Sequence, residues 1–175
     1  MRLAQVLSII LLLGSTAAFP QWIDGQGRPL PQTPSMKSDG NMGVQLVLTP
    51  DETKFRDAWN TATAAPQLRS ADTLRRGEKI SAMILVHGCT AARSGNCDVD
   101  VKFILIDPTG KKVPAGEGPL WSLPPQSGRI LLSNTSLTVG FDSTDQPGAY
   151  KLQAHVTDNV SGKKLELVAA FKLLN

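Results

Sequence analysis

Hydrophobic and polar residues alternate along most of the chain after Gly77. Apolar residues take every second position in five segments, which span residues 80–86, 99–105, 137–141, 150–156 and 165–173. Such alternation predicts strands with one buried face and one wet face, as in antiparallel sheets. Turn sequences such as Asp107–Gly110 separate the segments, and no helical pattern lies between them. With shorter candidate strands at 44–48 and 129–132, the pattern predicts about seven antiparallel strands packed as an all-β sandwich.

A short helix is predicted between residues 49 and 60, before the alternating region. The sequence Thr-Pro-Asp-Glu at 49–52 matches a capping box in which Thr49 is the N-cap and the proline takes the first helical position. Phe55 and Trp59 are four residues apart and therefore share one face of this helix. We expect that face to pack on the main domain, with a stripe for partner binding as the alternative.

Proline and glycine gather in two segments that lack the alternating pattern. Residues 19–43 are predicted to form an irregular N-terminal tail, because proline cannot donate to a sheet ladder and glycine weakens ordered segments. Residues 113–125 are interrupted in the same way and are predicted to form a long connection or short edge pieces. Trp22 and Ile23 make an apolar island in the tail, which either folds back on the domain or anchors a partner protein.

The first 18 residues have the layout of a secretory signal peptide. Met1 and Arg2 precede a mostly apolar run at 6–13 and a series of small residues at 14–18. The run is far shorter than the roughly 20 apolar residues that span a bilayer, so no membrane span is expected after cleavage. We therefore predict export to the periplasm or the medium, with cleavage near Ala18. Cleavage also lowers the formal net charge of +3 by one.

These patterns divide the chain into four parts. Residues 1–18 form the signal peptide, 19–43 the tail, 44–76 a strand and a short helix that pack on the domain, and 77–175 the sandwich domain. The predicted fold class is thus all-β, with a short N-terminal helix and an irregular tail before the sandwich.

The corner before the strand at 150–156 carries a family resemblance. Its sequence, Asp-Gln-Pro-Gly-Ala-Tyr at 145–150, resembles the corner of immunoglobulin-like domains, in which an Asp, a Gly and a Tyr recur in that order. The alternating residues from Gly148 to Asp158 are also similar to the penultimate strands of bacterial immunoglobulin-like and fibronectin III-like modules. Two features depart from antibody domains: Leu152 stands where the second core cysteine would be, and residues 97–105 contain no tryptophan.

The resemblance covers roughly residues 74–174 and implies an immunoglobulin-like sandwich. It also implies a structural corner made by Asp145, Gly148 and Tyr150, with the tyrosine hydroxyl bonded to upstream backbone. It says nothing about a ligand, because this architecture serves many functions.

Cys89 and Cys97 are the only cysteines of the chain, and they lie between two predicted strands. In an oxidising compartment such a pair predicts a disulfide, which here braces the tip that joins the strands. The alternative is a soft-metal site, because His87 and Cys89 point the same way on a strand and Cys97 supplies a third ligand. Asp98 and Asp100 share the wet face of the next strand and are either a paired-carboxylate site or simply solvated.

Composition argues against most catalytic and nucleic-acid functions. The chain has two His and few aromatic residues, and it contains no Gly-x-Ser-x-Gly nucleophile elbow and no glycine-rich phosphate loop. Its basic residues are scattered and are not interleaved with aromatic residues, so no nucleic-acid partner is expected. No cofactor and no metal are assigned. The glycan acceptor triplets at Asn134 and Asn159 matter only in a eukaryotic source.

The function expected from these observations is a non-catalytic binding or assembly module of the cell envelope, which recognises another envelope or extracellular protein through its loops or tail. The candidate contact residues are Trp22, Ile23, Arg93 and Trp121. Two alternatives stay open. One is a metal carrier or enzyme centred on the Cys89/Cys97 loop, and the other is a carbohydrate-binding sandwich with Trp121 as a stacking platform.

Overall fold

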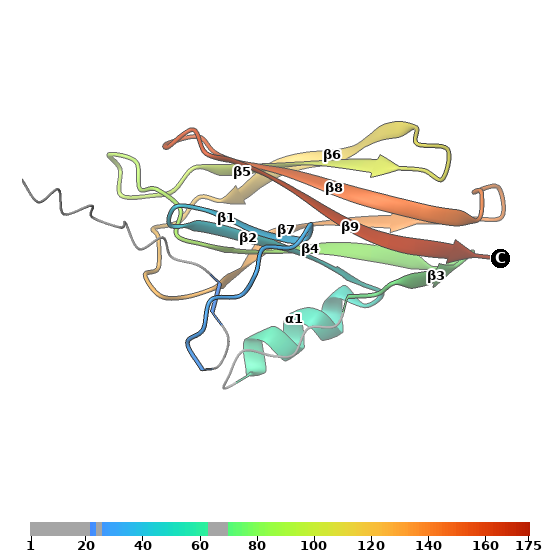
Figure 1. The fold of residues 1–175 in the computed structure, drawn as a ribbon, viewed down its shortest axis with the longest axis horizontal. Coiled ribbons are helices and arrows are strands. Elements are labelled where there is room, and N and C mark those ends of the chain that lie inside the picture. The colour runs from blue at the N-terminus through green and yellow to red at the C-terminus, as the bar shows by residue number, and fades with distance from the viewer. Residues whose placement is uncertain (1–21, 24–25, 63–69) are drawn as a thin grey trace, which may run out of the picture.

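The structure is a computed structural model that describes residues 22–23, 26–62 and 70–175. The predicted signal peptide, residues 1–18, lies outside the described residues. In these described residues nine strands form two sheets that pack face to face, and one short helix, α1 (Glu52–Thr61), lies against the outside of one sheet (Figure 1). No helix in the described part of the chain is long and apolar enough to cross a membrane.

The strand order defines an immunoglobulin-like arrangement. The four-stranded sheet has the order β1-β2-β4-β7, with the bounds β1 Met36–Asp39, β2 Met42–Thr49, β4 Lys79–His87 and β7 Leu131–Gly140. The five-stranded sheet has the order β3-β9-β8-β5-β6, with the bounds β3 Thr73–Arg75, β5 Val99–Ile106, β6 Lys112–Trp121, β8 Gly148–Asp158 and β9 Lys164–Leu174. β2-β4-β7 correspond to strands A, B and E of immunoglobulin domains, β9-β8-β5 to G, F and C, and β6 to C′. The predicted all-β sandwich is confirmed.

The alternating pattern fills the space between the sheets. On β8, Leu152, Ala154 and Val156 are buried, and they face the inward residues of β9 and β5. β4 differs from this pattern, because every residue from Ile80 to Val86 is buried. Its inward residues join the main core, whereas Met83 and Leu85 belong to a second cluster on the outer face of the four-stranded sheet.

Helix α1 and the N-terminal segment cover that outer face. Phe55 and Trp59 from α1 pack with Met83 and Leu85, as the shared helix face predicts, and Trp22 joins the same cluster. The outer face of β4 is therefore dry. This is why β4 is hydrophobic at nearly every position, a pattern that fits a strand covered on both sides.

Two segments expected to be irregular contain strands. Part of the predicted tail forms the hairpin of β1 and the start of β2, and β2 lies in the sheet between β1 and β4. The sandwich therefore begins at Met36 and not at residue 77. Residues 112–121, expected to be a broken connection, form β6 at the edge of the five-stranded sheet. An edge strand tolerates Pro114 and Pro119, and two register shifts in its pairing with β5 absorb the irregularity.

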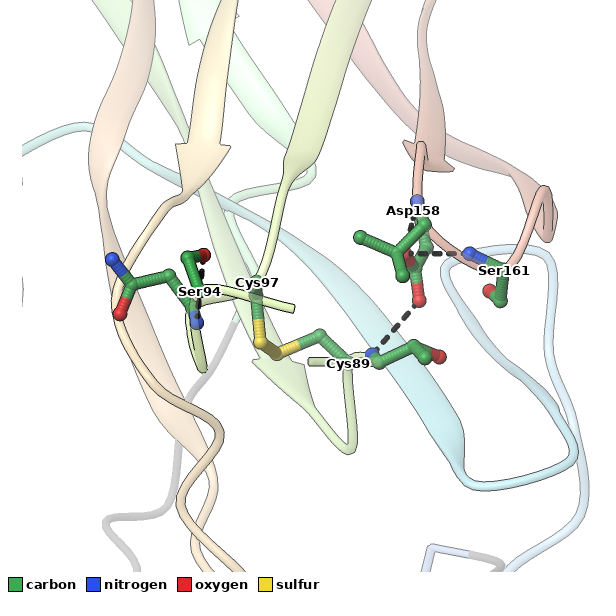
Figure 2. Close-up of a disulfide and its surroundings, with 8 residues drawn as sticks. Cys89, Ser94, Cys97, Asp158 and Ser161 are labelled. Atoms are coloured by element: carbon green, nitrogen blue, oxygen red, sulfur yellow. Dashed lines mark hydrogen bonds between the residues drawn. A yellow bond between two sulfur atoms is a disulfide. The ribbon is translucent and has the colours of Figure 1, made fainter. Parts of the chain in front are cut away.

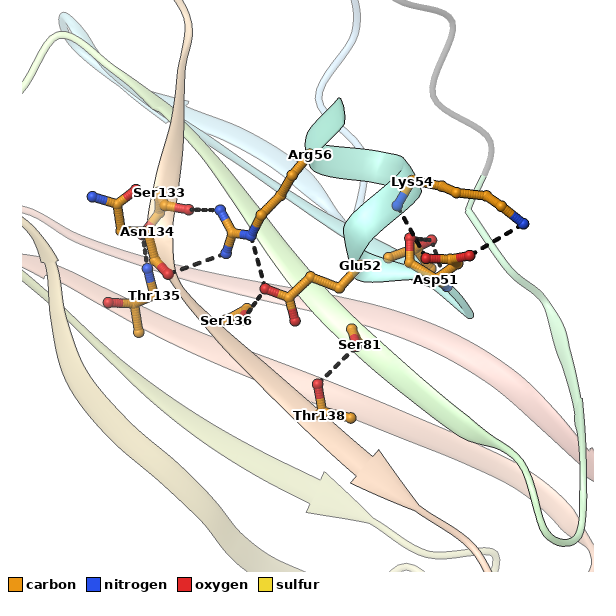
Figure 3. A network of polar contacts seen from close by, with 11 residues as sticks. Asp51, Glu52, Lys54, Arg56, Ser81, Ser133, Asn134, Thr135, Ser136 and Thr138 are labelled. Atoms are coloured by element: carbon orange, nitrogen blue, oxygen red, sulfur yellow. Dashed lines mark hydrogen bonds and ion pairs between the residues drawn. The ribbon is translucent and has the colours of Figure 1, made fainter. Parts of the chain in front are cut away.

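The two short strands expected at 129–132 and 137–141 are one strand, β7, with a bulge at its middle. The register shifts between Met83 and Leu85, where residues 133–135 have no partner on β4. The bulge carbonyls of Ser133 and Asn134 accept hydrogen bonds from the Arg56 guanidinium of α1, at 3.0 and 3.1 Å (Figure 3).

Asp51, and not Thr49, is the N-cap of the helix. Its Oδ1 accepts the backbone N–H of Lys54 at 3.0 Å, whereas the Thr49 hydroxyl bonds with the backbone of Asp51. Glu52 does not reach back to the cap, because its carboxylate accepts hydrogen bonds from Arg56 Nε at 2.8 Å and Ser136 Oγ at 2.7 Å (Figure 3). The acidic residue of the expected capping box thus fastens the helix to β7.

The corner before β8 has the hydrogen bond that the family resemblance implies. The Tyr150 hydroxyl donates to the Gln146 carbonyl at 2.9 Å, and the Tyr150 ring packs against Phe141 and Phe171. Gly148 has a φ of +149°, and a Cβ on it would lie 2.8 Å from the Pro108 ring. Only glycine fits there without displacing the neighbouring turn.

Candidate functional site

The disulfide is present and links the end of β4 to the start of β5 (Figure 2). Cys89 and Cys97 are bonded to each other with 6.0 Å between their Cα atoms, and both are buried. Because the bond uses both sulfurs, the expected alternative of a metal held by His87 and two thiolates is wrong for this structure. No cluster of three or more His, Cys, Asp or Glu side chains among the described residues could hold a metal ion.

A buried carboxylate, which the sequence did not single out as a site, ties this loop to the turn between β8 and β9. Asp158 is fully enclosed, and its oxygens accept the backbone N–H groups of Thr90, Val160 and Ser161 at 2.9, 3.0 and 3.2 Å (Figure 2). Burial raises the pKa of Asp158, but the hydrogen bonds from Thr90 and Ser161 outweigh it and leave the pKa below its usual value. The ionised carboxylate is therefore a structural clamp on the disulfide loop.

The carboxylate pair on β5 is bridged by an amide. Asn159 Nδ2 donates to Asp98 Oδ1 at 3.1 Å and to Asp100 Oδ2 at 2.7 Å. This contact holds both carboxylates on the turn that follows β8. Among the residues that the structure describes, no third acidic ligand joins them, so the geometry favours a structural bridge over an acid–base pair.

A cavity of about 530 Å³ opens at the same end of the sandwich. Four stretches of chain form it: Trp22 and Ile23, which pair with residues 29–30, Asn41 in the turn between β1 and β2, the end of β4 with the residues after it, and the connection between β6 and β7. Its lining residues are Trp22, Ile23, Asn41, His87, Gly88, Cys89, Pro125, Gln126, Ser127, Gly128, Arg129 and Ile130. Its volume lies within the range of ligand-binding pockets in proteins.

Trp22 forms one wall of this cavity from a buried position. Its indole Nε1 donates to the Lys37 carbonyl at 3.3 Å, and its ring meets the His87 ring edge-on at a centroid distance of 4.9 Å. The indole is only 6% exposed, whereas its neighbour Ile23 is 62% exposed. Of the predicted contact pair, Trp22 supports the wall and Ile23 presents an apolar surface.

His87 makes part of the floor. Its ring lies over Gly43, where a Cβ would come within 2.1 Å of Nε2, so the close packing requires glycine on β2. Burial lowers the pKa of His87, and a hydrogen bond to the Asn41 backbone opposes this only in part. The imidazole is therefore uncharged near neutral pH.

The connection between β6 and β7 forms the opposite wall. The Leu123 carbonyl accepts the Cys97 N–H at 3.0 Å, and the Arg129 N–H closes a turn on the Gln126 carbonyl at 3.3 Å. Cys89 lies in the floor and Cys97 holds the base of the wall, so the disulfide connects the two. Ile130, 40% exposed, completes the apolar lining.

The other predicted contact residues lie outside the cavity. Arg93 is exposed on the disulfide loop. Trp121 packs partly buried against the main core, and its indole N–H is shielded without a hydrogen-bond partner among the described residues. Asp145, Gly148 and Tyr150 lie at the opposite end of the sandwich. Sequence reasoning missed Asn41, Gln126, Arg129 and Ile130, because no pattern along the chain shows that these separate segments meet.

The fold and the site define an all-β, disulfide-braced sandwich with a cavity between its loops at one end. No protein-family model matches the chain, and no curated protein is similar to it. Some solved structures are distantly similar to the chain.

Three of these structures illustrate their range. The sporulation control protein Spo0M from Bacillus subtilis has a TM-score of 0.45 at 14% identity, over 78% of this chain and 51% of its own. A CARDB domain from Pyrococcus furiosus, solved with di-metal ions, has a TM-score of 0.44 at 8% identity, over 82% of this chain and 98% of its own. A family 123 glycoside hydrolase from Clostridium perfringens has a TM-score of 0.42 at 13% identity, over 75% of this chain and only 27% of its own.

Proposed function

We propose that this protein is an exported, non-catalytic binding or assembly module of the cell envelope, which holds another protein at its cavity end. The observation that carries the proposal is that exposed apolar side chains gather at this end. Of the six large hydrophobic side chains exposed among the described residues, Ile23 and Ile130 line the cavity. Leu30 and Leu123 belong to the same two segments. A gathering of exposed apolar side chains on a small protein is typical of an interaction site.

Export is supported by two independent features. The first 18 residues have the layout of a signal peptide. The disulfide between Cys89 and Cys97 is the bond that an oxidising compartment favours.

The site favours binding over catalysis or metal transport. The cavity lining holds one imidazole, kept uncharged by burial, and a disulfide that occupies both cysteine sulfurs. The packing of Trp121 on the core weakens the sugar-stacking alternative, because a stacking platform presents an open ring face.

Cross-linking in the native host tests this function. For this experiment a tag is added at the C-terminus, because the C-terminus lies at the end opposite the disulfide loop (Figure 1). A double variant, Ile23→Asp with Ile130→Asp, places charges on the apolar rim of the cavity. Val113→Asp is the matched control, because Val113 is similarly exposed but lies on β6 at the far end.

We expect one cross-linked protein to recur with the unmodified chain and with the control, and to be lost with the double variant. Equal urea midpoints of all three proteins verify that the substitutions leave the fold intact. A cross-linked partner that persists in the double variant, or no partner in repeated preparations, would overturn the proposal.

A further inference from the structure

The described lining of the cavity carries a single permanent charge. Among the lining residues that the structure describes, Arg129 is the only one that is charged at all working pH values, and none is an aspartate or a glutamate. Burial holds the pKa of His87 down, so its ring adds no charge near pH 7. The Arg129 side chain is exposed and makes no hydrogen bond or ion pair with other described residues. Its five N–H donors are therefore available to a bound molecule.

A second positively charged side chain lies beside a lining residue of the cavity. Lys163, from the turn between β8 and β9, donates its Nζ to Asn41 Oδ1 at 2.9 Å. Asn41 itself lines the cavity. The carboxylates of Asp158, Asp98 and Asp100 are also at this end, but none of them lines the cavity: Asp158 is enclosed, and Asn159 bridges the other two. A molecule in the cavity therefore meets Arg129 as the charged group of the described lining.

The charge and the apolar surface adjoin each other. Arg129 precedes Ile130 directly, and Ile23 and Pro125 supply further apolar surface in the lining. A guanidinium beside an aliphatic surface suits a ligand that offers a carboxylate next to an apolar side chain, because the fork of N–H donors pairs with a carboxylate. Nucleic acid fits poorly, since it calls for several cations and open aromatic faces.

We infer that the cavity recognises a peptide segment of a partner protein in which a large apolar side chain lies next to an Asp or Glu, the apolar group entering between Ile23 and Ile130 and the carboxylate pairing with Arg129. This inference rests on the proposed function and names the chemistry of the partner.

Selection from a phage library of random heptapeptides tests the inference. The mature protein is immobilised through its C-terminus, which leaves the cavity end free. Arg129→Glu reverses the charge of the cavity, and Arg93→Glu is the matched control, because Arg93 is an exposed arginine at the same end but outside the lining. One enriched peptide is then synthesised with its acidic residue intact or replaced by lysine, and binding is measured by calorimetry.

The unmodified protein and the Arg93→Glu control are expected to enrich peptides with an aliphatic or aromatic residue beside an acidic one. Arg129→Glu is expected to lower the affinity for the acidic peptide about tenfold or more, because it removes a charge-assisted hydrogen bond. The same variant is expected to bind the lysine peptide more tightly than the unmodified protein does. Arg93→Glu is expected to change neither affinity more than about twofold, as for a charge that a bound peptide does not contact.

Two outcomes would overturn the inference: enrichment without acidic residues, or an affinity for the acidic peptide that Arg129→Glu leaves unchanged. The proposed function is judged separately. If the cross-linked partner is lost with the Ile23 and Ile130 substitutions but retained with Arg129→Glu, the binding module stands and the peptide chemistry is wrong.

Discussion

The two ends of the sandwich are built in different ways. At the end that holds the tyrosine corner, short turns fold onto themselves through their own side chains. Asp107 accepts hydrogen bonds from the backbone of Thr109 and Lys111, and Tyr150 bonds to the Gln146 carbonyl. At the disulfide end the β4–β5 and β6–β7 connections are longer, and the first is held at its base by the Cys89–Cys97 bond and by the Asp158 clamp.

The difference shows how a small protein can keep a surface free for binding. A turn that satisfies its own backbone uses its polar side chains and presents little else. A loop fixed at its base by a disulfide and a buried carboxylate keeps the side chains at its tip unengaged. The cavity, the exposed isoleucines and Arg129 all lie at the second kind of end.

The largest expected effect comes from removing the disulfide. Replacing Cys89 and Cys97 with alanine is expected to lower the free energy of unfolding by about 2.5 kcal/mol, because the unfolded chain regains the freedom of the closed loop. Partner cross-linking should weaken as well, since the bond joins the floor of the cavity to its wall. Urea unfolding measures the first effect. Once its thiols are shown to be free, the reduced unmodified protein should be as stable as the variant, and a reduced protein that keeps the full stability would show that the loop needs no bond.

A smaller effect is expected from the clamp, and it depends on pH. Asp158→Asn is expected to cost about 2 kcal/mol at pH 7, because it weakens hydrogen bonds to a charged group. The folded pKa of Asp158 lies below its unfolded value of about 3.8, so the ionised form stabilises the protein above that value, and the contribution is lost as the pH falls through the folded pKa.

Urea unfolding at pH 7 and at pH 3 should therefore show a smaller gap between the variant and the unmodified protein at the lower pH. Asp39→Asn, at an exposed position on β1, is the matched control and should show little gap at either pH. A gap for Asp158→Asn that is constant with pH would mean that the charge contributes nothing.

The smallest effect is expected at the opposite end. Tyr150→Phe keeps the ring packed between Phe141 and Phe171 but removes the hydroxyl bond to Gln146, at a cost of about 1 kcal/mol. Partner cross-linking should stay unchanged, because the corner lies far from the cavity. If the Tyr150→Phe variant stays folded but no longer cross-links to the partner, the corner end contributes to binding, and the two ends do not have separate roles.

The sequence was sufficient for the architecture because one physical rule dominates it. Period-two burial places Leu152, Ala154 and Val156 in the core, and the structure buries all three. The rule fails where other forces decide. Prolines in β6 indicate a break, but an unpaired edge tolerates them, and Thr49 fits a cap position that Asp51 fills with a better acceptor geometry. Both errors arise from tertiary context that a local pattern does not contain.

The candidate site was much less accessible from the sequence. The cysteine pair predicts its own bond, since spacing and compartment carry the information. Arg129 and Ile130 carry no comparable signal, because their importance comes from meeting Ile23 across the cavity more than a hundred residues away in sequence. Asp158 likewise resembles any residue at a strand end until its three backbone donors are seen.

The edges of the two sheets have a further consequence, for behaviour in a crowded compartment. Each edge strand in the described part of the chain is blunted in its own way. β1 and β3 are only 4 and 3 residues long, β6 carries two prolines and two register shifts, and β7 bulges where Arg56 holds its carbonyls. Such edges resist pairing with strands of other chains, which is a route to aggregation. The protein can therefore accumulate without polymerising through its sheets, and contact with other molecules is left to side chains.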